Sequence, residues 1–86
     1  MDLSQSEAAI MAHYNEKTRI AGGVKAGYLL RLESIRHLRN EEPQLDVEGG
    51  LGALVEKDLL QPTEKGDRYY LTEAGAEYLS RRQPAS

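Results

Sequence analysis

The chain contains no cysteine, phenylalanine or tryptophan, and only three prolines among its 86 residues. Without cysteine it cannot form a disulfide bond, a cysteine-ligated zinc site or a thiol nucleophile. Without phenylalanine and tryptophan, its core must be built mainly from twelve leucines and five tyrosines. No apolar run approaches the roughly 20 residues of a membrane-spanning helix. The polar start, Met1–Glu7, lacks the apolar stretch of a secretory signal, so we expect a cytoplasmic protein.

An excess of positive charge is also missing. The formal net charge is −3 at pH 7, whereas nucleic-acid-binding domains are typically basic. The apolar share of 40% and the charged share of 29% are ordinary for a globular domain. A chain of this length has room for one domain, which we expect to span residues 1–86 with an ordered core at about 4–82.

Two helices are predicted in the first half of the chain. Ser4 and Glu7 have the spacing of a capping box, which starts a helix that runs from residue 4 to about 20. Gly22-Gly23 ends it. An apolar stripe at helical spacing predicts a second helix from residue 25 or 28 to 39. The stripe consists of Tyr28, Leu32, Ile35 and Leu38.

A third helix is predicted from Val47 to about Lys57, with Asp46 as its N-cap. Its apolar residues follow the spacing i, i+4, i+7, i+8. Three glycines lie inside it, and each costs about 1 kcal/mol relative to alanine. We therefore expect packing, or the close approach of another segment, to hold this helix together. The glycines are Gly49, Gly50 and Gly52.

The hydrophobic period then changes from that of a helix to that of strands. Residues 59–63 and 68–72 flank a short turn, Glu64–Asp67, which predicts a two-stranded hairpin. A last helix is predicted from residue 73 to about 82, capped by Thr72. Its inward side chains are expected to be Ala74, Tyr78 and Leu79.

The order of these elements resembles the winged helix-turn-helix domain of small bacterial and archaeal transcriptional regulators. The local sequence agrees with this resemblance over residues 47–79. The matching segments are Leu51-x-x-Leu54-Val55-Glu56-Lys57-Asp58-Leu59-Leu60 and Gly66-Asp67-Arg68-Tyr69-Tyr70-Leu71-Thr72-x-x-Gly75. The first two helices match only in order and length. The resemblance implies a mainly α fold with a small β-hairpin (α+β): three helices, a two-stranded wing and a C-terminal helix.

The chain departs from the family pattern in two places. Asp58 stands where relatives usually carry glycine after the third helix, and aspartate accepts the left-handed conformation less readily than glycine. Residues 40–45 form a longer connection than the tight turn of the simplest helix-turn-helix.

The resemblance implies a DNA-binding transcriptional regulator. In such domains the third helix enters the major groove and the hairpin contacts the DNA backbone or the minor groove. A homodimer is expected, because one domain of this size has a short footprint and pairing doubles it. The candidate nucleic-acid-binding residues are Lys25, Gln44, Glu48, Gly49, Gly52, Lys57, Lys65 and Arg68.

The negative charge is concentrated where this function requires contact with DNA. Residues 1–39 carry a formal charge of +2, residues 40–67 carry −6 and residues 68–86 carry +1. Carboxylates that face phosphates are repelled. The alternative function is therefore a winged-helix protein-interaction module, in which the acidic third helix and the loop before it bind a basic partner.

The sequence contains no complete motif of catalytic or cofactor-binding residues. Gly22–Tyr28 has the glycines of a phosphate-binding loop, but Tyr28 and Leu29 stand where lysine and serine or threonine are required. His13 and His37 lie on different predicted helices without the spacing of metal ligands. We expect no enzymatic activity, no metal and no cofactor.

Overall fold

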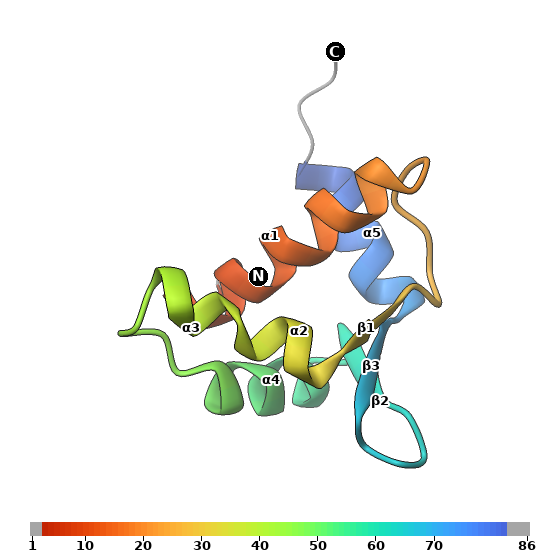
Figure 1. Ribbon diagram of the computed structural model, residues 1–86. Coiled ribbons are helices and arrows are strands. Elements are labelled where there is room, and N and C mark those ends of the chain that lie inside the picture. The colour runs from red at the N-terminus through yellow and green to blue at the C-terminus, as the bar shows by residue number, and fades with distance from the viewer. Residues whose placement is uncertain (1–2, 83–86) are drawn as a thin grey trace.

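The computed structural model describes residues 3–82, an α+β fold in which helices and one three-stranded antiparallel sheet share a single core (Figure 1). Within these residues, no helix combines the length and the apolar character needed to cross a membrane. The elements, in chain order, are α1 (Gln5–Ile20), β1 (Leu29–Arg31), α2 (Leu32–Arg36), α3 (Leu38–Glu41), α4 (Val47–Glu56), β2 (Leu60–Pro62), β3 (Arg68–Leu71) and α5 (Glu73–Arg82).

Helix α1 begins and ends as the sequence predicts. The Glu7 N–H donates to Ser4 Oγ at 3.2 Å, and the Ser4 N–H donates to Glu7 Oε1 at 3.0 Å. This reciprocal pair is a capping box, which satisfies two of the free N–H groups at the helix start. After the C-cap, Gly22 and Gly23 have φ values of 110° and 128°, which side chains other than that of glycine rarely tolerate.

The prediction of a second helix is wrong for the residues before Leu32. Residues 29–31 are not helical but form β1, which pairs with β3 through Leu30 opposite Tyr69. The helix begins only at Leu32 and is interrupted at His37, which separates α2 from α3. Pairing with a strand about forty residues later overrides the local helical spacing, because it satisfies the backbone of this segment: the Leu71 N–H donates to the Tyr28 carbonyl at 3.0 Å.

The predicted hairpin is confirmed, but it belongs to a three-stranded sheet with the order β1-β3-β2. Gly66 occupies its turn with φ 73°, a conformation that favours glycine. Pro62 lies on β2, an edge strand, where the lack of an N–H is tolerated. The turn projects away from the helices at the lower right of Figure 1.

Helices α1 and α4 pack closely where Gly50 lies. A Cβ atom at Gly50 would lie 3.0 Å from Ile10 Cδ1 and 3.2 Å from Ser6 Cβ, so the close approach expected from the glycines is confirmed at this position. A Cβ atom at Gly49 would collide with the side chain of the N-cap residue Asp46, which accepts a hydrogen bond from the Gly49 N–H at 3.1 Å. Gly52, in contrast, has no atom within 4 Å of where its Cβ would lie.

Asp58 follows α4 with φ 60°, so an aspartate adopts a left-handed conformation that favours glycine. The chain then turns into β2, and β3 leads into α5. Thr72 caps α5 as predicted, because its Oγ1 accepts the Gly75 N–H at 2.9 Å. Leu79 faces the core and Tyr78 is half-buried, but the inward placement of Ala74 is wrong. Ala74 is exposed because Gly75 occupies the inward position.

Candidate nucleic-acid interface

The exposed face of α4 carries carboxylates and glycines. Val47, Gly50, Leu51 and Leu54 of this helix are buried, whereas Glu48, Gly49, Gly52 and Glu56 are exposed. Glu48 Oε1 accepts a hydrogen bond from Arg36 Nε at 2.8 Å, and both side chains are about half exposed. Arg36 therefore offsets the negative charge of Glu48. The second carboxylate of this face, Glu56, lies at the other end of α4.

Lys57, the one basic candidate near α4, is directed toward α1. Its Nζ lies 2.5 Å from Glu7 Oε2, and the Glu7 side chain is 7% exposed. The hydrogen bond from Lys57 is the main cause that holds the pKa of Glu7 below its usual range, against the effect of burial. The ammonium group thus joins the start of α1 to the end of α4, a contact between residues fifty positions apart.

The Glu7–Lys57 pair makes stability depend on acid. A carboxyl whose folded pKa is lowered contributes stability above its ordinary pKa, and that contribution is lost as the pH falls from about 4.5 through the folded pKa. Lys57→Met is expected to lower the free energy of unfolding at pH 7 by about 1–3 kcal/mol, because it removes the ammonium donor from Glu7 Oε2, while the buried carboxylate keeps the Ser4 N–H. The free energy of unfolding of this variant should also fall less steeply below pH 4.5 than that of the original chain.

Urea unfolding of the two proteins at pH 7 and at several lower pH values checks this prediction. Lys65→Met is the matched control, because Lys65 is exposed on the hairpin turn. Equal stability of the Lys57→Met variant and the original chain at pH 7, or an unchanged decline in acid, would contradict the assigned role.

The hairpin and β1 bring together cations that the sequence places far apart. Lys65 lies on the exposed turn and Arg68 begins β3. Arg31 lies directly opposite Arg68 in the antiparallel register. Arg31, Arg36 and Arg68 line a groove of about 340 Å³, and Lys65 and Arg68 line a second groove of about 380 Å³. Asp67 lines both grooves.

Two of the remaining candidates lie in loops. Lys25 is exposed in the segment before β1, and Gln44 is exposed in the segment before α4. The Gln44 amide donates to Glu42 Oε2 at 3.4 Å. The other candidates form two groups: Glu48, Gly49 and Gly52 lie on α4, and Lys65 and Arg68 lie at the hairpin.

Arg31 was absent from the residues that the sequence singled out. The helical spacing of residues 28–38 places Arg31 on the polar side of a helix, with Arg36 and Arg39, as a solvated surface charge. The signal that could have found it is the run Gly27-Tyr28-Leu29-Leu30, in which a glycine precedes β-strand-favouring and apolar residues. Gly27 does mark the start of this strand, with φ 87° and an N–H that donates to the Leu71 carbonyl at 2.6 Å.

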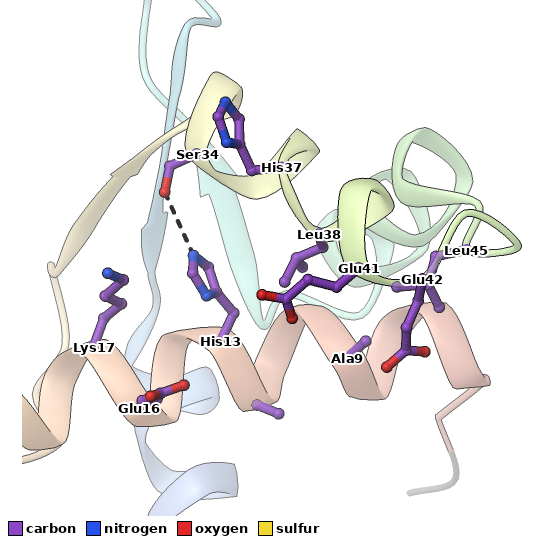
Figure 2. Close-up of a pocket in the computed structure, with 11 residues that line it drawn as sticks. Ala9, His13, Glu16, Lys17, Ser34, His37, Leu38, Glu41, Glu42 and Leu45 are labelled. Carbon is purple, nitrogen blue, oxygen red and sulfur yellow. Dashed lines mark hydrogen bonds between the residues drawn. The ribbon is translucent and has the colours of Figure 1, made fainter.

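A separate groove of about 400 Å³ lies between α1 and the α2–α3 segment (Figure 2). His13 Nε2 lies 3.4 Å from Ser34 Oγ across it, and the dashed line in Figure 2 marks this contact. Burial lowers the pKa of His13, which favours the neutral ring. No residue of α4 or of the sheet lines the groove. In the part of the chain that the structure describes, no group of three or more acidic or histidine side chains is placed to hold a metal ion.

Comparisons with known protein families, curated proteins and solved structures give no match to this chain.

Proposed function

We propose that the chain is a small winged-helix DNA-binding domain that regulates transcription. The observation that carries this proposal is the strand order β1-β3-β2, in which a strand between α1 and α2 pairs with the second strand of a projecting hairpin. Together with the exposed helix α4 that precedes the hairpin, this arrangement resembles the sheet, wing and recognition helix of winged-helix domains (Figure 1).

Two exposed cations of the hairpin support contact with the DNA backbone, beside two exposed carboxylates, Glu64 and Asp67. Lys65 and Arg68 are both exposed, and among residues 3–82 neither forms an ion pair with a carboxylate. Most protein–DNA hydrogen bonds go to phosphate and sugar, and basic side chains on projecting segments commonly make them. The hairpin therefore offers cations that are available to phosphates.

A titration with duplex DNA tests the proposal. Fluorescence anisotropy with labelled random and genomic duplexes, at low and at moderate salt, is expected to show binding that weakens steeply as salt rises. The physical reason is counterion release from the phosphates. Absence of binding to every duplex at low salt would contradict the proposal.

Arg68→Glu is expected to weaken binding to all sequences alike, because a phosphate contact carries no sequence information. The slope of log affinity against log salt should fall by about 1 for the lost contact. Arg39→Glu, which reverses an exposed charge on α3, is the matched control. A loss limited to duplexes that differ at one base position would show that Arg68 reads a base.

The face of α4 favours a second candidate function, a winged-helix protein-interaction module. Glu48 and Glu56 are exposed on α4, and Gly52 leaves open space beside its backbone. Such a face suits a basic partner better than DNA. This function is supported if affinity purification recovers one partner in equal amount, if Glu48→Lys with Glu56→Lys abolishes that recovery, and if DNA binding is absent.

A further inference from the structure

The outer face of the sheet is a defined surface of five side chains. Residues directly opposite each other in an antiparallel sheet point to the same face, and neighbours along a strand alternate between faces. The register places Leu29, Tyr70 and Gln61 in one row, and Arg31 and Arg68 in the next. Their exposure agrees, because both arginines are exposed and Leu29 is 46% exposed, whereas Leu30, Leu60 and Leu71 on the opposite face are buried.

The arginine pair on this face is unfavourable for the chain alone. Like charges directly opposite each other on neighbouring strands destabilise a sheet. Asp67 and Glu33 line the adjoining groove, yet among the described residues neither forms an ion pair with Arg31 or Arg68. An anion that lies between the two guanidinium groups would remove this repulsion, and guanidinium groups bind phosphate through paired N–H donors.

The outer sheet face and α4 differ in the sign of their charge. The five side chains of the sheet face include two cations and no carboxylate. The adjoining hairpin turn adds Lys65, Glu64 and Asp67, so three cations and two carboxylates leave the combined surface with a net charge of +1. The exposed side of α4 instead presents Glu48 and Glu56. Duplex DNA carries one negative charge per about 1.7 Å of its axis, so its backbone is attracted to the first surface and repelled by the second.

We propose that the outer sheet face and the hairpin turn, rather than α4, lie against the DNA backbone, with Arg31 and Arg68 contacting phosphates. This inference rests on the proposed function and changes which surface performs it. Tyr70 and Leu29 then lie against the sugars beside the contacted phosphates. Lys65 extends the contact along the hairpin, and the exposed carboxylates of α4 make no contact with the duplex.

Glutamine variants separate a phosphate contact from a structural role. Arg31→Gln and Arg68→Gln are each expected to weaken duplex binding about tenfold at low salt and to reduce the salt slope by about 1. Without DNA, each variant should unfold at the same temperature as the original chain or higher, because the repulsion between the arginines is relieved. Arg19→Gln removes an exposed charge from the end of α1 and is the matched control.

NMR mapping of the duplex-binding surface on the protein decides between the outer sheet face and α4. Amide shifts are recorded for the isotope-labelled full chain with and without an unlabelled duplex at low salt. The inference predicts shifts at residues 29–31 and 61–70 and none along the exposed side of 48–56. Shift changes concentrated on α4, or an affinity for the duplex that rises more than about fivefold in Glu56→Gln, would contradict the proposed contact through the sheet face. Either result would still support DNA binding by the domain. Absence of any binding would overturn the DNA-binding function and this surface together.

Discussion

Leu54→Asp is expected to unfold the domain. Leu54 is fully buried on α4, within the core that α1, the sheet and α5 share. The substitution removes a buried leucine side chain, at a cost of about 2–5 kcal/mol. It also places a carboxylate among apolar side chains, with a further cost because a buried charge needs a partner. A domain of this size has a free energy of unfolding of only about 4–13 kcal/mol, so the sum is comparable with the whole stability.

Circular dichroism and amide shift dispersion measure this effect directly. The variant should lose the dispersion of a folded protein. Glu56→Asp, which introduces the same residue at an exposed position of the same helix, should remain folded. A Leu54→Asp protein with native chemical shifts would show that Leu54 does not lie in the core.

Gly75→Ala is expected to have the second largest effect, because the start of α5 packs against Leu59, in the connection between α4 and β2, and against Leu71 of β3. A Cβ atom at Gly75 would clash with the Leu59 carbonyl oxygen and lie 2.7 Å from Leu71 Cδ1. The carbonyl belongs to the backbone and accepts the Thr72 N–H at 3.1 Å, so it cannot move aside without loss. We expect the free energy of unfolding to fall by about 2 kcal/mol or more, despite the higher helix propensity of alanine.

Gly52→Ala is the matched control for this prediction. Nothing lies within 4 Å of the added methyl group at this position of α4, and the backbone is helical. The free energy of unfolding should therefore rise by about 0.5–1 kcal/mol, from helix propensity alone. Urea unfolding of both variants decides the matter, and a Gly75→Ala variant as stable as the original chain would contradict the close packing of α5.

The elements that the sequence predicted correctly have local signals. The capping box of Ser4 and Glu7 begins α1, and Asp46 caps α4 at the predicted residue. Gly66 marks the hairpin turn. Each of these features is determined within a few residues, so the sequence around it is sufficient to predict it.

The elements that were mispredicted depend on distant residues. β1 is three residues long and exists through its pairing with β3, while the apolar spacing around it also fits a helix. The exposed position of Ala74 follows from the packing of Gly75 against Leu59, not from the local pattern.

The candidate site shows the same division between local and distant information. The exposure of Lys65 and Arg68 follows from the hairpin, which the sequence predicts. The pairing of Arg31 with Arg68 and that of Lys57 with Glu7 join residues 37 and 50 positions apart, and only the fold reveals them. These two pairs change the expected contact surface, because one places a second arginine beside the hairpin and the other directs a lysine toward α1.

The most direct test of DNA binding is the affinity of the full chain for a random duplex as a function of salt. Between about 20 and 200 mM salt, we predict a straight line of log affinity against log salt, with a negative slope that corresponds to two or more phosphate contacts. An affinity too weak to detect at the lowest salt, or one that does not change with salt, would contradict the proposal that this domain binds the DNA backbone.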